Sequence, residues 1–189
     1  MAKSYSGTPM QNPKSYYTKS EVNLMIKACR KYRDKLLLLT LAKTGRRVSE
    51  IVRCLKPADI DFDQGLVNYT ILKRKIQTKK LLPMDRHLLG LIEKYIKTRR
   101  IGPDDYIFPI SRQRVDQIIK RAGERVGVKM AHAHVFRHSF AIQSAQKLKN
   151  PADLVQLKEL MGHARMDTTM FYLKFNPREQ RELLEEMWK

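Results

Sequence analysis

Hydrophobic residues recur at helical spacing from the first part of the chain onward. Thr18 and Glu21 have the S/T-x-x-E spacing of a capping box, which marks the start of a helix. The apolar positions that follow share one helical face: Val22, Met25, Ile26 and Cys29. We therefore expect ordered structure to begin at Thr18.

Two further helices are predicted before the pattern changes. An apolar run predicts a core helix over about residues 35–43, which stops at Gly45. A third helix is expected over residues 47–54, and Pro57 ends it because proline cannot continue a helix.

Residues 60–83 show a strand pattern instead. Residues 60–67 fit a strand, a tight turn and a second strand, and residues 68–73 continue with β-branched and aromatic side chains. A polar tip at 74–78 is followed by a returning strand over 79–82. The pattern predicts a small three-stranded antiparallel sheet.

Helical spacing returns after the sheet, with prolines at the joints. The predicted helices cover about residues 86–98, 111–126, 134–147, 152–161, 168–174 and 178–188. The fold class expected from these elements is α+β, mostly α-helical with the small sheet.

The chain of 189 residues fits one domain with a tail. Residues 1–17 are polar and show no periodicity, so we expect a flexible N-terminal segment. Residues 18–175 form the expected folded domain. Residues 176–189 are expected to form a C-terminal helix.

Charge narrows the choice of partners. The chain has 38 Lys and Arg against 19 Asp and Glu, a net charge of +19. Such a balance favours a polyanionic partner, with nucleic acid first and an anionic membrane surface as the alternative. The basic residues are scattered over many elements rather than gathered beside an apolar anchor, which favours a broad DNA-facing surface.

Other composition signals exclude several classes. Cys29 and Cys54 show no paired spacing, which argues against a disulfide framework or a zinc site. No run reaches the roughly 18 apolar residues that a membrane span requires. We find no signal peptide and expect a cytoplasmic location, with the DNA.

Arginine, histidine, lysine and tyrosine recur in segments whose chemistry fits phosphoryl transfer. Breaking a phosphodiester without water or metal needs a nucleophile, positive donors for the non-bridging oxygens, and an acid for the departing 5′ oxygen. The segments are Thr44–Glu50, a lysine-rich hairpin around Lys75, His134–His138, and Leu160–His163 with Tyr172.

Two arginines are candidate phosphate donors, because a guanidinium offers a planar fork that matches two phosphate oxygens. One is Arg137. The other is Arg46 or Arg47, at the turn after Gly45. Glu50 lies one helical turn beyond Arg47 and can hold it in place, although this spacing also fits an ordinary surface pair.

Histidines accompany the arginines. His134 and Arg137 are spaced i, i+3 and therefore share a helical face, where His134 can accept or donate a proton near neutral pH. His163 follows Gly162, whose left-handed capping geometry would let the histidine project from a turn. Either spacing alone also occurs in ordinary helices.

Tyr172 is the candidate nucleophile. A free phenol has a pKa of about 10 and is a poor nucleophile at neutral pH. Nearby arginines and histidines would favour the phenolate. The alternative is an ordinary half-buried aromatic residue beside Phe171.

The order and spacing of these segments resemble the catalytic domain of tyrosine recombinases of the lambda-integrase and Xer type. The resemblance extends over about residues 18–188 and implies the catalytic-domain fold of DNA breaking-rejoining enzymes. The family pattern Thr-Gly-x-Arg selects Arg47 over Arg46. The implied catalytic residues are Arg47, Lys75, His134, Arg137, His163 and Tyr172.

The resemblance also assigns supporting roles. A lysine at the hairpin tip protonates the leaving 5′ oxygen, and counting back from Pro83 matches it to Lys75, with Lys73 as second choice. The expected supporting residues are Glu50 and His138. The expected DNA-binding residues are Arg46, Lys73, Arg74, Lys79 and Lys80.

The implied reaction is site-specific recombination through a covalent 3′-phosphotyrosyl intermediate, without ATP, metal or any other cofactor. Family members assemble as tetramers on two double-stranded DNA sites and pass through a Holliday junction. The C-terminal helix would dock on a neighbouring subunit or fold back in cis. We expect the chain to associate with the nucleoid. In the absence of DNA, the sequence is compatible with a monomer as well as with an oligomer.

Two alternatives use the same fold. One is nicking and closing of DNA, as in type IB topoisomerases, and the other is a DNA-binding accessory or regulatory protein without efficient recombination. Most family members also carry an N-terminal helical domain, which residues 1–17 are too short to form. We therefore interpret the chain as an excised catalytic domain or a compact member.

Overall fold

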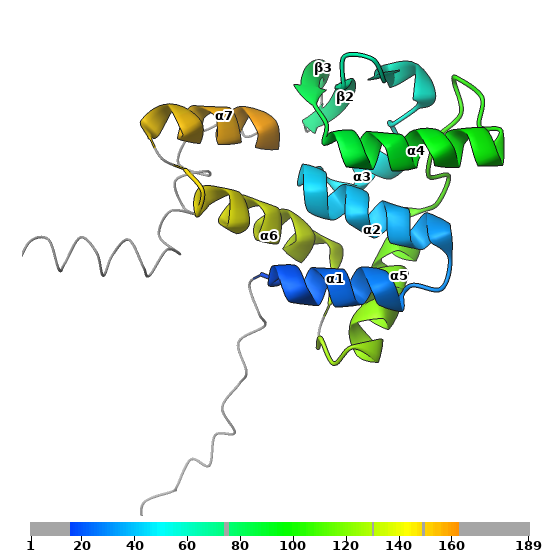
Figure 1. Cartoon of the computed structure of the whole chain (residues 1–189), viewed down its shortest axis with the longest axis vertical. Coiled ribbons are helices and arrows are strands. Elements are labelled where there is room, and N and C mark those ends of the chain that lie inside the picture. The colour runs from blue at the N-terminus through cyan, green and yellow to red at the C-terminus, as the bar shows by residue number, and fades with distance from the viewer. Residues whose placement is uncertain (1–15, 74–75, 130, 149, 163–189) are drawn as a thin grey trace, which may run out of the picture.

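The computed structural model describes residues 16–73, 76–129, 131–148 and 150–162. Figure 1 shows their arrangement. The elements in chain order are α1 (Lys19–Ala28), α2 (Tyr32–Thr44), α3 (Val48–Val52), the 3-10 turn η1 (Pro57–Asp59), β1 (Ile60–Asp61), β2 (Leu66–Lys73), β3 (Ile76–Pro83), α4 (Arg86–Arg99), α5 (Arg112–Arg125), α6 (Ala133–Ala145) and α7 (Pro151–Met161).

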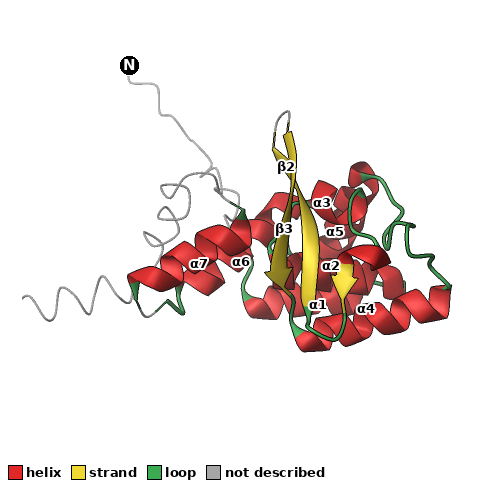
Figure 2. Cartoon of the chain, turned by 90° about the horizontal axis from the view of Figure 1, so that it is seen from above, coloured by secondary structure: helices red, strands yellow, loops and turns green. Residues whose placement is uncertain are grey.

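The predicted fold class is confirmed. The described residues are mostly helical and contain one antiparallel sheet with strand order β1-β2-β3. Tyr69 of β2 pairs with Lys80 of β3, and Ile60 of β1 pairs with Val67. Figure 2 shows the sheet lying along one side of the helices.

The observed helix boundaries differ by a few residues from the predicted ones. The helix expected over 35–43 begins at Tyr32, and the helix expected over 134–147 ends at Ala145. The helices predicted over 168–174 and 178–188 lie outside the described residues.

Helix α2 forms the centre of the core. Leu36, Leu37, Leu38 and Leu41 are all at most 2% exposed, and the helix packs against α1, α4 and α6. A helix that is apolar around most of its circumference must be buried on several sides. This position fixes the C-terminal end of α2, where the candidate site begins.

The capping box predicted at Thr18 is present. The Thr18 hydroxyl accepts a hydrogen bond from the Glu21 amide at 3.2 Å, and the Thr18 amide donates to Glu21 Oε2 at 2.8 Å. The reciprocal bonds satisfy two amides that the first turn of a helix leaves unpaired.

Tyr17 corrects the predicted start of the folded part. The sequence predicts a flexible segment over residues 1–17, but Tyr17 is 1% exposed and packs edge-on against Phe136. Its amide donates to Ser139 Oγ at 2.7 Å, and its hydroxyl accepts from the His132 amide at 2.9 Å. Tyr17 therefore joins the segment immediately before α1 to α6, a long-range contact that periodicity does not reveal.

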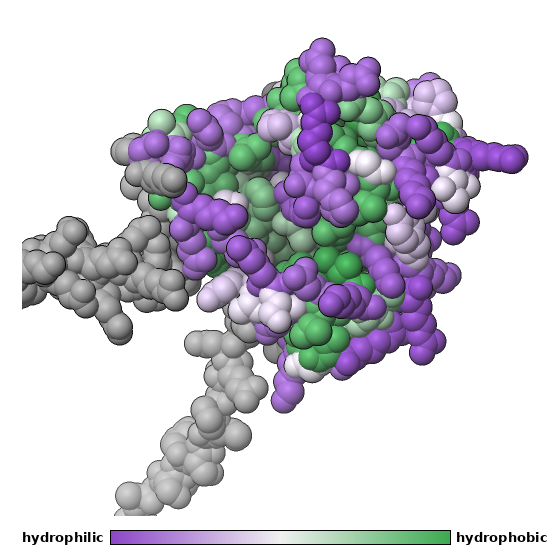
Figure 3. Space-filling view, viewed as in Figure 1, coloured by the Kyte–Doolittle hydropathy of each residue, from purple (hydrophilic) through white to green (hydrophobic). Residues whose placement is uncertain are grey.

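Apolar side chains also reach the surface on the face that carries α1, α2 and α6 (Figure 3). There Val22, Ile26, Leu39 and Phe140 help to line a hollow of about 310 Å³. Among the described residues, none of the helices combines the length and the apolar character needed to cross a bilayer.

Candidate active site

The site begins at the turn that ends α2. Gly45 has a left-handed backbone, with φ 60°, and caps the helix through its amide on the Leu41 carbonyl. A Cβ atom at this position would lie 2.3 Å from Cδ1 of Phe140. Glycine is thus required both by the turn and by the close approach of α6.

Arg47 leaves this turn as the N-cap residue of α3. Its Nη1 donates to Glu50 Oε1 at 3.0 Å, and its amide donates to Glu50 Oε2 at 3.1 Å. The Leu72 amide of β2 also donates to Oε1, at 3.4 Å. Glu50 is 1% exposed whereas the Arg47 side chain is 41% exposed, so a buried carboxylate holds an accessible arginine.

Arg137 is buried and joins two chain turns. Nη1 donates to the Gly45 carbonyl and Nη2 to the Met161 carbonyl, each at 2.7 Å. The two acceptors lie at the C-terminal ends of α2 and α7, where backbone carbonyls lack helical partners. One guanidinium therefore fixes the ends of two helices relative to α6.

His134 and His138 lie one turn apart on α6. Their rings meet edge-to-face, with centroids 4.4 Å apart. Partial burial, followed by the positive charge of Arg137, lowers the pKa of His134 below its ordinary 6.5. Burial and His134 lower the pKa of His138 in the same direction. The lowered pKa favours the uncharged His134 imidazole near neutral pH, and this form can accept a proton.

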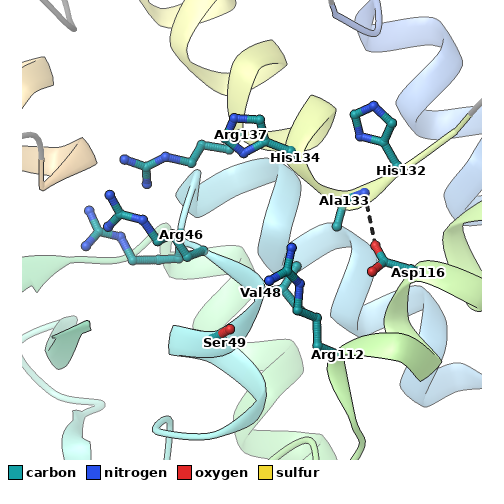
Figure 4. Close-up of a pocket in the computed structure, with 10 residues that line it drawn as sticks. Arg46, Val48, Ser49, Arg112, Asp116, His132, Ala133, His134 and Arg137 are labelled. Carbon is teal, nitrogen blue, oxygen red and sulfur yellow. Dashed lines mark hydrogen bonds between the residues drawn. The ribbon is translucent and has the colours of Figure 1, made fainter. Parts of the chain in front are cut away.

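The side chains meet around a cavity of about 380 Å³ (Figure 4). The residues that line it come from the turn before α3 and the start of that helix, from α5, and from α6 with the residue before it: Arg46, Arg47, Val48, Ser49, Arg112, Asp116, His132, Ala133, His134 and Arg137. Three predicted catalytic residues, Arg47, His134 and Arg137, therefore share one open cavity.

Sequence reasoning missed part of this lining. Arg112, at the first turn of α5, contributes a further positive charge, and Asp116 Oδ1 accepts from the Ala133 amide at 3.4 Å (Figure 4). The spacing of these residues gave no signal, because α5 reaches the site only through packing. His132, which was not among the predicted site residues, also lines the cavity.

Arg46 does not lie where we expected a DNA-binding residue. It is 2% exposed, and its Cζ lies 5.2 Å from the centre of the Tyr69 ring. The turn at Gly45 sends its side chain inward toward β2, while Arg47 remains accessible. Its side chain is therefore much less accessible than that of Arg47, and the DNA-binding role predicted for it stays a prediction.

Two hairpin lysines have acidic partners. Lys79 is exposed and lies 3.5 Å from Asp59, and Lys80 forms an ion pair with Glu159 of α7. Exposed pairs of this kind are weak and are compatible with exchange for a phosphate. The roles predicted for Lys79 and Lys80 stay predictions.

Several predicted site residues lie outside the described residues. They are Arg74, Lys75, His163 and Tyr172. Lys73 ends β2. The described residues contain no group of three His, Cys, Asp or Glu side chains able to hold a metal ion.

The fold and the cavity define a class of protein. Arginines and an uncharged histidine, gathered on a rigid helical frame, form a site suited to an oxyanion such as a phosphodiester. The Phage integrase family matches residues 15–179 of the sequence, and the chain belongs to that family.

Curated relatives extend the similarity. The chain is 33% identical over 187 residues to tyrosine recombinase XerA of Pyrococcus horikoshii, covering 94% of this chain and 62% of that protein. It is 34% identical over 188 residues to XerA of Pyrococcus furiosus, covering 94% and 63%. The chain thus spans less than two thirds of these relatives.

Solved structures show the same fold. The crystal structure of XerA recombinase matches with a TM-score of 0.71 at 24% identity, over 91% of this chain and 64% of that chain. The catalytic domain of bacteriophage HP1 integrase matches with a TM-score of 0.65 at 19% identity, over 90% and 93%. XerH bound to its difH substrate in a post-cleavage complex matches with a TM-score of 0.71 at 20% identity, over 94% and 54%.

Proposed function

We propose that this chain is the catalytic part of a site-specific tyrosine recombinase, which cuts and rejoins DNA through a 3′-phosphotyrosyl intermediate. One observation carries the proposal: Arg47, His134 and Arg137, from two distant segments, line one open cavity. Membership of the Phage integrase family and the names of the curated relatives support it.

The described residues suit the electrostatic part of the reaction. The accessible guanidinium of Arg47 would bind non-bridging oxygens of the scissile phosphate, with Glu50 fixing its direction. Arg137 would add a second positive charge at a fixed position, since its bonds to Gly45 and Met161 hold the guanidinium in place. Charge that develops on phosphate oxygens in the transition state is stabilised by such preorganised donors.

The covalent step would use residues outside the described part of the chain. The Tyr172 oxygen attacks phosphorus and forms the 3′-phosphotyrosyl bond, while the bond between phosphorus and the 5′ oxygen breaks. The electron pair leaves on the 5′ oxygen, which takes a proton from Lys75. His163 donates a hydrogen bond to the phosphate, and an uncharged His134 can accept the phenol proton. Attack by a 5′ hydroxyl on the phosphotyrosine reverses these steps and rejoins a strand.

The proposed partner is double-stranded DNA, on which four copies of the protein assemble at two sites. The energy of the phosphodiester is kept in the covalent bond, so the proposal needs no ATP or metal. With a net charge of +19, DNA affinity should fall steeply with salt as condensed counterions are released. We place the activity in the cytoplasm, with the nucleoid DNA.

A nicked duplex tests the proposal. The protein is incubated without metal with duplex fragments that carry a nick close to each candidate site, so that a short 5′-hydroxyl fragment diffuses away and the adduct accumulates. A protein–DNA band on a denaturing gel, absent from Tyr172→Phe, supports the proposal. An adduct that also relaxes supercoiled DNA without a partner duplex would favour nicking and closing. Salt-sensitive binding with no adduct, even in a longer chain with an N-terminal domain, would favour an accessory DNA-binding protein.

A further inference from the structure

Arg46 is an unusual residue to find in the interior of a protein. Its side chain is 1% exposed, and within the described residues neither Nη1 nor Nη2 has a hydrogen-bond partner. Burial lowers its pKa, and Glu50 acts in the opposite direction. A buried charge without hydrogen bonds is costly, so its presence calls for a compensating role.

Two neighbours define its surroundings. The guanidinium lies over the Tyr69 ring, and Nη1 lies 3.9 Å from Glu50 Oε2, which is an ion pair without a hydrogen bond. The Tyr69 hydroxyl is itself buried and unpartnered in the described part of the chain. The aromatic face thus accommodates the cation, while the carboxylate supplies the opposite charge.

The same carboxylate serves both arginines. Glu50 Oε1 accepts from Arg47 Nη1, while Oε2 faces Arg46. Two cations and one anion leave a net positive charge on the cluster. Without Arg46, Glu50 and Arg47 would form a neutral pair, and Glu50 would oppose the attraction of Arg47 for a phosphate.

We propose that Arg46 is a positioning residue for strand cleavage, whose buried charge offsets Glu50 so that Arg47 presents its full positive charge to the scissile phosphate. The proposal rests on the proposed recombinase function. In this role Arg46 contacts no DNA and acts only through Glu50 and Arg47. The Coulomb interaction over such short distances is large in a poorly screened interior. Removing the Arg46 charge should therefore lower the positive potential at the cavity.

The rival explanation is that Arg46 only fills space. Its Nη1 would be 3.6 Å from a Cβ atom at Gly162, so the side chain packs below the turn that ends α7. A purely structural role predicts that an apolar residue of similar length would serve as well, because Glu50 keeps its ion pair with Arg47 when Arg46 is replaced.

The test compares Arg46→Met, Arg46→Lys and a control, Arg53→Met. Arg53 is exposed at the end of α3, so its replacement removes the same charge from the surface without touching Glu50. Single-turnover cleavage of a nicked duplex at saturating protein is measured beside the Kd for the duplex and the free energy of unfolding.

We expect Arg46→Met to slow cleavage at saturation roughly 10- to 100-fold, with little change in Kd and no loss of stability. Arg46→Lys should recover part of the rate because it restores the charge, and Arg53→Met should cleave at the normal rate. Equal rates for Arg46→Met and the unchanged protein would overturn the proposal. So would equal losses in the Met and Lys variants together with reduced stability. If the unchanged protein forms no adduct, the proposed function itself fails, and this inference falls with it.

Discussion

The guanidinium of Arg137 binds the carbonyl oxygen of Met161, with Nη2 donating at 2.7 Å. Met161 is the last residue of α7, and its carbonyl is among those that a helix leaves unpaired at its C-terminus. A cation is also favoured at the negative end of the helix dipole. The arginine predicted to bind phosphate therefore also fixes the end of the helix that precedes His163.

Replacing Arg137 by lysine should reduce both stability and cleavage. A lysine cannot reach the Gly45 and Met161 carbonyls together, so one buried acceptor is left unsatisfied, at a cost of about 1–3 kcal/mol. Urea unfolding measures this loss, and the nicked duplex measures the cleavage rate. Arg99→Lys, at an exposed position on α4, is the matched control and should change neither. Unchanged stability in Arg137→Lys would contradict the anchoring role.

Gly45 and Gly162 offer a comparison between strain and steric overlap. Both have left-handed backbones, with φ 60° and 64°, so alanine at either costs about 1–2 kcal/mol in backbone strain. Only at Gly45 would the new Cβ overlap a neighbour, at 2.3 Å from the Phe140 ring against 3.6 Å for the nearest atoms at Gly162. We expect Gly45→Ala to lose about 1–3 kcal/mol more free energy of unfolding than Gly162→Ala. Equal losses in denaturant unfolding would show that Phe140 moves aside freely.

Local spacing predicted much of this structure. The capping box at Thr18 and the contact between Arg47 and Glu50 both join residues three apart, and both are present. The β-branched and aromatic residues between 60 and 83, interrupted by polar turns, likewise predicted the sheet, because such residues favour strands. Contacts between residues that are close in the sequence can be predicted from their spacing alone.

Long-range packing was not predictable in the same way. Arg46 and Arg47 are neighbours of identical type, yet the side chain of Arg46 is buried against Tyr69 and that of Arg47 is accessible. The difference depends on the turn at Gly45 and on a strand more than twenty residues away. Tyr17 was missed for the same reason, since its partners Ser139 and His132 lie 122 and 115 residues further along the chain.

Removing the charge of Glu50 should destabilise the protein strongly. Glu50→Gln leaves the buried Arg46 without an opposite charge, and breaking a buried pair by removing one partner costs about 3–5 kcal/mol. Glu159→Gln is the control, because its pair with Lys80 is partly exposed and is worth no more than about 1 kcal/mol. Adding Arg46→Met to Glu50→Gln should recover part of the lost stability, since the uncompensated cation is removed as well. Losses that simply add would show that Arg46 and Glu50 do not interact.

The pH dependence of cleavage should reflect His134. Burial and nearby positive charges, including Arg137 and Arg112, lower its pKa below 6.5, so the uncharged imidazole predominates above that value. If this form accepts the phenol proton, the single-turnover rate is full near neutral pH and falls as the pH drops through a midpoint below 6.5. The lowered pKa of His134 affects the stability of the folded protein in the same direction as the cleavage rate. The unfolded chain binds the proton more tightly, so the contribution of His134 is complete above 6.5 and decreases below it.

Arg112→Gln tests whether His134, rather than another titrating group, sets the midpoint of the pH–rate profile. Removing one positive charge from the cavity should raise the pKa of His134, and the midpoint of the rate profile should move up toward 6.5. Rates measured between about pH 5 and pH 8 cover the range in which histidine titrates. A midpoint above 6.5, or one that stays fixed in Arg112→Gln, would show that another group controls the acid limb. A downward shift would contradict the electrostatic argument itself, because losing a cation cannot favour the uncharged histidine.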